Sequence, residues 1–249
     1  MPNRAPTNPH ARSVPSVLIA AGPTHEPVDA VRYIANRSSG RLGLALADAA
    51  RQRHCPTTLL IGPGVIPHTD HTTARTRPAN ADPGQAPDSA ATVRRFRTSA
   101  DLEVLLLEES AACDVLIMAA AVADYRPATV HAGKLPRTGD SLSIELEPVP
   151  DLLAMATKTM KPGGIAIGFA LEENSGSHER SIDKMARKAC HAIVLNPLAT
   201  MDSAAIDATI LFADGSPPLA PGPLSKEAFA HRLIEVALDL WAPARGTES

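Results

Sequence analysis

Short, uninterrupted apolar runs recur along this chain, separated by stretches in which apolar residues repeat with a helical period. Such runs are typical of strands that are buried on both faces of a parallel sheet. They predict strands at Val17–Ala21, Thr57–Ile61, Val115–Ala120, Gly164–Ala170, Ala192–Leu195 and Thr209–Ala213, and a shorter, more polar strand at Val93–Arg97.

Helices are predicted between these strands. After Gly40, apolar residues recur at Leu42, Ala45, Leu46 and Ala49. Side chains that commonly accept hydrogen bonds from a helix N-terminus predict three further helix starts, at Thr98 or Ser99, at Asp151 and at Ser225. Another helix is expected near 179–190. Alternating strands and helices predict an α/β fold with a mainly parallel sheet, helices on both faces, and ligands beyond the carboxyl ends of the strands.

Several segments lack a hydrophobic period. Residues 1–15 predict a disordered leader, and residues 16–249 are expected to form one domain. The stretch at about 63–92 is rich in Pro, Ala, Thr and Asp and predicts a mobile surface excursion. Residues 122–140 predict a loop. Beyond that loop, Leu142, Ile144 and Leu146 alternate with polar residues and predict a half-exposed strand.

Composition narrows the class of protein. The chain has 249 residues, of which 44% are hydrophobic, and a formal net charge of -3, which argues against a broad nucleic-acid-binding surface. No apolar run is long enough to span a membrane, and the first residues lack the apolar core of a secretory signal. The separated Cys55, Cys113 and Cys190 predict neither a disulfide framework nor a zinc site, and they indicate a cytoplasmic protein.

The loop after the first predicted strand lacks the GxGxxG fingerprint of dinucleotide-binding proteins. Gly22 permits a turn that a side chain would hinder. Ser38, Ser39 and Gly40 open the next helix, where backbone N–H groups offer a natural anion seat. The alternative is that Ser39 serves only as the helix cap.

Polar side chains mark the loops after Ala21 and Ala120. The Asn36 amide can donate to a carbonyl or acyl-phosphate oxygen, or it can simply form a turn. Arg32 can pair with a phosphate or be an ordinary surface cation. Asp124 can hold Mg²⁺, accept a hydrogen bond from a base or sugar, or simply cap a turn. Lys134 follows a glycine in a loop that could close over a site, although such a lysine is commonly solvated.

Lys184 and Lys188 lie four residues apart, which places two like charges on one helix face. Such a pair is favourable when an anion such as a triphosphate binds between them; otherwise it is a solvated face. Phe169, at the end of a predicted strand, can pack against a base or fill the core.

Three ordered motifs carry a family resemblance. The stretches AGPTHEPVDAVRYIANRSSGRLG, AAVADYRPATVHAGK, and GFALEEN followed by KMARK resemble phosphopantothenoylcysteine synthetase, from about Val17 to Trp241. The resemblance implies a Rossmann-like fold with a small flap or dimerisation region, and a homodimer. It also implies that 4′-phosphopantothenate is activated by CTP with Mg²⁺ and that L-cysteine then attacks the acyl-cytidylate, releasing CMP. A separate protein is expected to carry out decarboxylation.

The resemblance also assigns roles to individual residues. Asn36 matches the asparagine needed for turnover of the intermediate, and Lys134 matches the flexible-loop lysine needed to form it. Nucleotide contacts fall on Met118, Ala119, Ala120, Asp124, Lys134, Pro150, Asp151, Leu152, Leu153, Phe169, Lys184 and Lys188, with Asp124 also the metal ligand. Phosphate or substrate contacts are expected at Gly22, Arg32, Ser38, Ser39 and Gly40.

The sequence departs from the family pattern at the lysine loop. A KIKK-like loop is typical, whereas this chain reads Lys134-Leu135-Pro136-Arg137, and proline stiffens a loop. The departure motivates an alternative in which the chain is a catalytically inactive nucleotide-binding scaffold. ATP in place of CTP also stays open. A nicotinamide oxidoreductase is disfavoured because the glycine fingerprint is missing.

Overall fold

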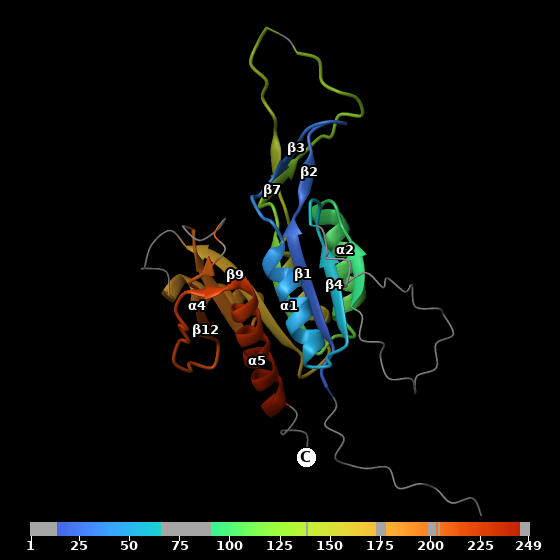
Figure 1. Cartoon of the computed structure of the whole chain (residues 1–249). Helices are drawn as coiled ribbons and strands as arrows, with labels where there is room; N and C mark the ends of the chain where they lie inside the picture. The colour runs from blue at the N-terminus through green and yellow to red at the C-terminus, as the bar shows by residue number, and fades with distance from the viewer. Residues whose placement is uncertain are drawn as a thin grey trace, which may run out of the picture.

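A seven-stranded sheet runs through the middle of the molecule, in the order β12-β10-β9-β6-β1-β4-β5 (Figure 1). The structure is a computed structural model and describes residues 14–65, 91–137, 139–172, 178–198, 203 and 205–244. Six strands are parallel, and β12 pairs antiparallel with β10. The strands are β1 (Val17–Pro23), β4 (Thr57–Ile61), β5 (Thr92–Arg95), β6 (Val115–Ala121), β9 (Ile165–Glu172), β10 (Ala192–Pro197) and β12 (Thr209–Phe212).

Helices cover both faces of the sheet, which confirms the predicted Rossmann-like α/β class. Helices α1 (Arg41–Gln52) and α5 (Lys226–Ala244) pack together on one face, over alternate strand residues such as Ile19 and Ile117. On the other face, α2 (Ser99–Ser110) and α3 (Leu152–Thr159) cover Leu18 and Leu116, and α4 (His178–Lys188) covers Ile193. Alternation along each strand therefore divides the core into two layers.

The predicted helix starts are largely confirmed. The Thr98 hydroxyl accepts from the Asp101 N–H in a capping box, and Asp151 accepts from Ala154 N–H at 3.1 Å. Ser225 Oγ accepts from Ala228 N–H at the start of α5. The alternative in which Ser39 caps α1 is wrong, because Gly40 is the N-cap residue, with a φ of 66° and no side-chain cap bond.

Two small hairpins rise beyond the carboxyl ends of β1 and β6 and form what we call the arm, residues 25–35 and 125–148 (Figure 1). In one, β2 (His25–Pro27) pairs with β3 (Tyr33–Ala35); in the other, β7 (Tyr125–Pro127) pairs with β8 (Leu146–Pro148). The long connection from β7 to β8 projects farthest from the sheet. A third small pair joins β11 (Ala205–Ile206) to β13 (Leu224–Ser225).

The arm corrects two expectations. Residues 122–140 are not entirely loop, since Tyr125–Pro127 forms β7. The half-exposed strand expected over Leu142, Ile144 and Leu146 is wrong for its first two members: only Leu146 belongs to a strand, and all three side chains are exposed. An alternating pattern forms a strand only when its backbone is paired along its length, and in the described structure residues 141–145 belong to no sheet, although the Glu145 carbonyl oxygen accepts from Ala128 N–H at 3.0 Å.

Parts of the prediction fall outside the described residues. These are residues 1–13 of the expected leader and residues 66–90 of the expected excursion. Among the described helices, none combines the length and the apolar character needed to cross a bilayer.

Candidate functional site

The carboxyl ends of β1, β6 and β9 meet at one edge of the sheet. In register, Gly22 lies beside Ala120, and Met118 lies beside Gly168. The loops that follow β1 and β6 therefore begin next to each other, as expected for the ligand-binding edge of a parallel sheet. Met118 is buried, whereas Ala119 and Ala120 are partly exposed, so small side chains line this edge.

Asn36 joins the first of these loops to the second. Its Nδ2 donates to the carbonyl oxygen of Val122 at 2.8 Å, although the two residues are 86 positions apart in the chain. The Thr24 hydroxyl makes a second link, since it accepts from Ala123 N–H at 3.1 Å. Asn36 is exposed, so its amide sits at the surface of the edge rather than inside the core.

The loop after β6 is in turn tied to the segment that precedes α3. Val149 N–H donates to the carbonyl oxygen of Asp124 at 2.9 Å. The chain then passes through the exposed Pro150 to Asp151, the N-cap of α3, while Leu152 and Leu153 turn into the core. The Asp124 side chain itself is exposed at this edge.

Asp151 links α4 to the same edge of the sheet through an ion pair with Lys188. Lys188 Nζ lies 2.9 Å from Asp151 Oδ2 and 3.0 Å from Oδ1. Burial raises the pKa of Asp151, but the hydrogen bond from Lys188, the Ala154 N–H and the charge of Lys184 outweigh burial, so the pKa lies below its usual value. Lys184 and Lys188 are both partly exposed, and both lie near Asp151 at the α3 N-terminus.

Phe169 has a dual position. It is partly exposed at the carboxyl end of β9, and it also packs against the core layer under α1 and α5. Its neighbour in β10 is Val194. The described contacts are those of a core side chain at the rim of the candidate site.

The glycines of the predicted anion seat make a tight junction. Gly22 and Gly40 both have positive φ angles, of 89° and 66°. A Cβ at either position would lie within 2.6 Å of the Val65 side chain. Ser38 is partly exposed and its hydroxyl is 3.4 Å from Gly40 N–H, while Ser39 is exposed. Glycine is thus required at both positions by backbone conformation and by close packing.

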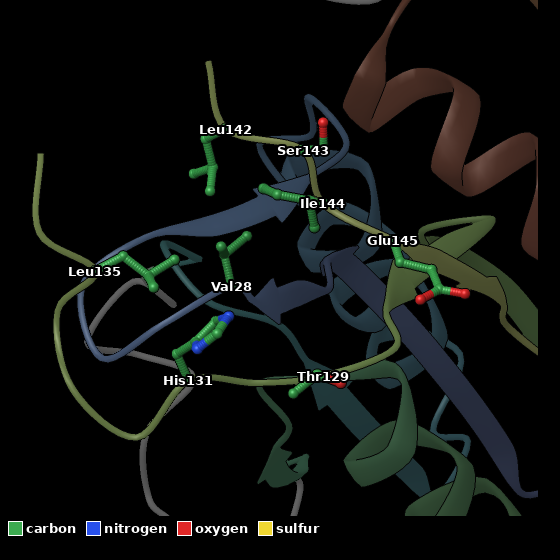
Figure 2. A pocket seen from close by; sticks show the side chains of 8 residues that line it. All are labelled: Val28, Thr129, His131, Leu135, Leu142, Ser143, Ile144 and Glu145. Carbon is green, nitrogen blue, oxygen red and sulfur yellow. The ribbon is translucent and has the colours of Figure 1, made fainter. Parts of the chain in front are cut away.

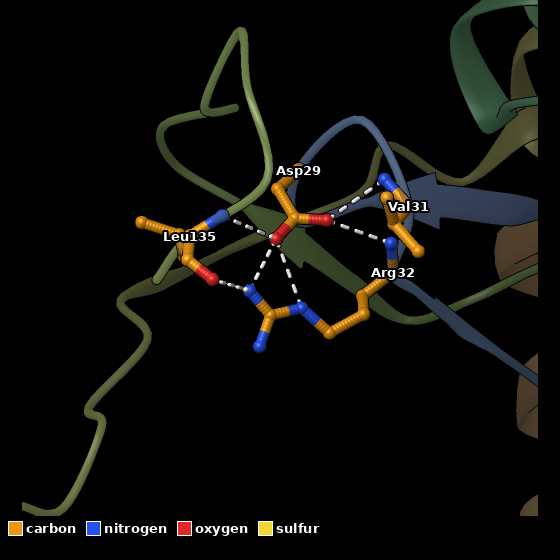
Figure 3. A network of polar contacts seen from close by, with 4 residues as sticks. All are labelled: Asp29, Val31, Arg32 and Leu135. Atoms are coloured by element: carbon orange, nitrogen blue, oxygen red, sulfur yellow. Dashed lines mark hydrogen bonds and ion pairs between the residues drawn. The ribbon is translucent and has the colours of Figure 1, made fainter. Parts of the chain in front are cut away.

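Arg32 is engaged within the arm (Figure 3). Its guanidinium forms an ion pair with Asp29, whose side chain is fully buried, and it donates to the carbonyl oxygen of Leu135 at 3.1 Å. The hydrogen bond from Arg32 holds the pKa of Asp29 far below its ordinary range, with further help from the Val31, Arg32 and Leu135 N–H groups against the effect of burial. Lys134, next to Leu135, is exposed.

A small pocket lies in the arm beside this network (Figure 2). Val28, Leu135 and Ile144 provide apolar walls, and His131 lies near its rim. The pocket is separate from the edge where Asn36 and Asp124 lie, and it is lined by side chains from both hairpins of the arm.

The chain can now be placed among known proteins. The DNA/pantothenate metabolism flavoprotein C-terminal domain family matches residues 13–240. The chain belongs to this family. It is 38% identical over 182 residues to a cysteine/cysteine sulfinic acid decarboxylase from an unknown prokaryotic organism, covering 73% of this chain and 45% of that protein. It is 31% identical over 241 residues to the coenzyme A biosynthesis bifunctional protein CoaBC of Mycobacterium tuberculosis, covering 91% of this chain and 52% of that protein.

Solved structures agree with the family. The crystal structure of the C-terminal domain of the coenzyme A biosynthesis bifunctional protein CoaBC aligns with a TM-score of 0.70 and 28% identity, covering 92% of this chain and 96% of that one. The chain spans about half the length of the curated relatives it matches. The likeness therefore concerns the C-terminal flavoprotein domain fold.

The predicted site residues fall into two groups. Asn36, residues 118–124, Asp151 and the α4 lysines lie along one sheet edge, linked by the hydrogen bonds described above. Arg32 and Lys134 belong to the arm, whose long connection extends away from α4 (Figure 1). Among the described residues no cluster of three potential metal ligands occurs.

Three buried polar residues escaped the sequence analysis. Thr24, Glu26 and Asp29 follow β1 within a few positions, and each side chain holds a different segment. Glu26 accepts from the Ser99 N–H at 2.8 Å and from its hydroxyl at 3.1 Å, at the start of α2. Two features of the sequence could have indicated these residues. One is the number of polar residues in a short loop, and the other is the spacing of Asp29 and Arg32, which suits a local ion pair.

Proposed function

We propose that the chain is a phosphopantothenate–cysteine ligase that acts in coenzyme A biosynthesis with CTP as co-substrate. The observation that carries the proposal is the continuous set of contacts from Asn36 through Val122 and Asp124 to Asp151 and Lys188. Family membership and the likeness to the CoaBC relatives support it. Each of the three motifs of the resemblance contributes a residue to this set, whereas Arg32 and Lys134 of the first two motifs lie in the arm.

The first half-reaction needs cations. A carboxylate oxygen of 4′-phosphopantothenate attacks the α-phosphorus of CTP, the bond to the β-phosphate breaks, and pyrophosphate leaves. Lys184 and Lys188 offer positive charge beside the N-terminus of α3, where a triphosphate would be stabilised. Lys134 would add charge from the arm. The acyl-cytidylate that forms is a mixed anhydride, which is a far better acyl donor than a carboxylate.

The second half-reaction needs a polarised carbonyl. The amine of L-cysteine attacks the acyl carbon, the bond from carbon to the phosphate oxygen breaks, and CMP leaves. Asn36 is fixed by its bond to the Val122 carbonyl oxygen and presents the rest of its amide at the exposed edge. A second Nδ2 hydrogen there would stabilise the developing charge on the acyl oxygen.

Magnesium fits the donors at this edge only in partnership with the nucleotide. Mg²⁺ is commonly held by one or two carboxylates together with substrate phosphates, and the exposed Asp124 provides one carboxylate. When bound, the ion would neutralise phosphate charge. Its binding by this chain alone is expected to be weak.

A homodimer would complete the site. The arm exposes large apolar side chains, which are more commonly buried away from water. They are Val31, Tyr33, Tyr125, Val130, Leu142, Ile144 and Leu146. Apolar clusters of this kind commonly mark protein–protein contacts. Since the arm reaches away from α4, pairing of two copies could deliver Lys134 of one subunit to the phosphate-binding edge of the other.

The deciding experiment measures pyrophosphate release by the purified chain with CTP, ATP, GTP or UTP, each with 4′-phosphopantothenate and Mg²⁺. We expect release with CTP that depends on the acid, and phosphopantothenoylcysteine after L-cysteine is added. No release with any nucleotide would contradict the proposal. Tight CTP binding without turnover would favour the alternative, a catalytically inactive scaffold, which the Lys134-Leu135-Pro136-Arg137 departure motivates.

A further inference from the structure

Asp29 accepts more hydrogen bonds than its turn requires. One oxygen, Oδ1, accepts from Val31 N–H at 2.8 Å and from Arg32 N–H at 2.7 Å, which closes the turn between β2 and β3. The other, Oδ2, accepts from Arg32 Nε at 2.9 Å, from Arg32 Nη2, and from Leu135 N–H at 3.0 Å (Figure 3). A carboxylate has about four lone-pair directions, so this group is saturated.

The bond to Leu135 spans 106 positions of sequence and joins the two hairpins of the arm. Arg32 reinforces it, because its guanidinium bonds both Asp29 and the Leu135 carbonyl oxygen. Both backbone groups of Leu135 are therefore fixed by one ion pair. The following residue, Pro136, has a fixed φ, which limits the freedom of the chain on the other side.

Lys134 is the residue directly before this anchor. Its side chain is exposed, whereas the Leu135 side chain lies in the arm pocket against Val28. The position of the Lys134 Cα is thus set by a buried carboxylate, while its ammonium remains available. A long lysine side chain placed from a fixed backbone loses less entropy on binding a phosphate than one on a mobile loop.

We propose that Asp29 is a positioning residue, which holds Leu135 and thereby presents Lys134 to the nucleotide phosphates. The inference rests on the proposed ligase function and on the role of Lys134 in it. It also explains why Leu135-Pro136 can stand where the family pattern has a KIKK-like loop. In this chain, stiffness and an ion-pair anchor replace the additional lysines of a KIKK-like loop.

The sharpest variant is Asp29→Asn, because it separates the two oxygens. The amide oxygen is expected to stay with the fixed Val31 and Arg32 N–H groups, since the Arg32 side chain can turn into solvent. The NH₂ group then faces Leu135 N–H, donor against donor, and the anchor is lost while the turn is kept. Asp101→Asn is the matched control, because Asp101 also accepts from two backbone N–H groups, those of Arg97 and Thr98.

Two measurements test the role. Hydrogen–deuterium exchange of a peptide covering 133–137 should accelerate in Asp29→Asn and not in Asp101→Asn. The kcat of pyrophosphate formation should fall about tenfold to a hundredfold with little change in the KM for 4′-phosphopantothenate, because displacement of a reacting group by about 1 Å can cost that much. Asp101→Asn should retain the wild-type kcat.

The outcomes distinguish the two hypotheses. Faster exchange with an unchanged kcat would overturn the positioning role, and so would a lower kcat with unchanged exchange. A wild-type chain that releases no pyrophosphate would instead overturn the proposed ligase function. Circular dichroism and thermal unfolding of Asp29→Asn must match those of Asp101→Asn. If Asp29→Asn is unfolded, Asp29→Glu replaces it, because its longer carboxylate keeps the charge but moves the anchor. Asp29→Glu is expected to show the same loss of kcat, and a wild-type kcat in that variant would overturn the role.

Discussion

Lys188 and Asp151 form an ion pair, with Nζ 2.9 Å from Oδ2, that joins the last turn of α4 to the N-cap of α3. The Lys188 side chain is about one-fifth exposed and that of Asp151 nearly half exposed, so the pair sits at the boundary between the protein and the solvent. An exposed pair of this kind contributes little to stability. The pair does, however, fix the position of a cation beside a helix N-terminus.

Replacing Lys188 should therefore weaken nucleotide binding more than folding. We expect Lys188→Met to raise the KM for CTP about tenfold to a hundredfold, since a charge-assisted hydrogen bond to a phosphate contributes about 1.5 to 3 kcal/mol. Lys158→Met, at an exposed position on α3, is the control and should keep the wild-type KM. Equal KM values for the two variants in steady-state kinetics would exclude Lys188 from the nucleotide site.

Asn36 should separate the two half-reactions. In Asn36→Asp, the donor to the Val122 carbonyl oxygen is lost and a negative charge is placed where the acyl oxygen gains charge. We expect pyrophosphate release close to one equivalent per site, followed by slow formation of phosphopantothenoylcysteine. Rapid-quench measurements with labelled CTP would detect the accumulated acyl-cytidylate. Equal loss of both steps would indicate that Asn36 serves only to join the loops.

The sequence predicted the central sheet well because its strands are buried on both faces. Val115–Ala120 and Ala192–Leu195 are each a short, uninterrupted apolar run, which is typical of a strand buried on both faces. The arm was harder to predict. Its strands are three residues long, and all but β3 contain proline, which is disfavoured in strands. The two hairpins are joined by the hydrogen bond from Leu135 N–H to Asp29, 106 positions apart, which no local pattern indicates.

The candidate site was predictable to a similar extent. The family resemblance, rather than residue type alone, assigned site roles to Asn36, Asp151 and Lys188, and these residues lie along one sheet edge. Asp29 and Glu26 were not identified, since a carboxylate in a loop is ordinarily solvated. Only the three-dimensional arrangement shows that both are buried and that each bonds to a distant N–H group.

Subunit complementation should show whether Lys134 acts across a dimer. At a CTP concentration well below the KM of Lys188→Met, the Lys134→Ala and Lys188→Met chains are each expected to be poorly active. After subunit exchange at equal concentrations, half of the dimers are mixed and each holds one intact site if Lys134 acts on the partner subunit. Activity should then recover to about a quarter of wild type. No recovery would place Lys134 and Lys188 in the same subunit's site.

The exposed apolar surface of the arm provides the control for this experiment. Leu142 is 58% exposed and Ile144 is 40% exposed. In the double variant Leu142→Asp/Ile144→Asp, the arm should no longer associate, and sedimentation velocity should report a monomer. A variant that still sediments as a dimer would remove the arm from the interface.

Acid should weaken the link between the start of β1 and β6. Burial raises the pKa of Asp114, but the bonds from Lys161 and Ser16 outweigh it and bring the pKa below its usual value. A lowered pKa in the folded state stabilises the fold above the unfolded pKa, about 3.9, and this contribution is lost as the pH falls below it. The free energy of unfolding should thus exceed that of Asp114→Asn by about 1 to 2 kcal/mol at pH 7.

Denaturant unfolding from pH 7 to pH 3 checks the direction of this effect. The difference between wild type and Asp114→Asn should shrink as the pH falls below about 3.9, where the unfolded chain takes up a proton that the folded chain resists. Asp140→Asn, at an exposed position in the arm, should show no such dependence. A difference that grows toward low pH would contradict the assignment.

Close packing of α1 on β1 gives a final prediction, on stability. A Cβ at Gly43 would lie 2.0 Å from the Ala21 Cβ, and both residues are buried. Gly43→Ala gains about 1 kcal/mol of helix propensity, but displacement of the helix from the sheet should cost more, since overpacking costs about 1 to 3 kcal/mol. The midpoint of thermal unfolding should fall, whereas Gly139→Ala, where a Cβ meets nothing within 4 Å, should leave it unchanged. Adding Ala21→Gly to Gly43→Ala removes the opposing methyl group, so the double variant should be more stable than Gly43→Ala alone. If it is not, the contact between these two positions does not limit how closely α1 approaches β1.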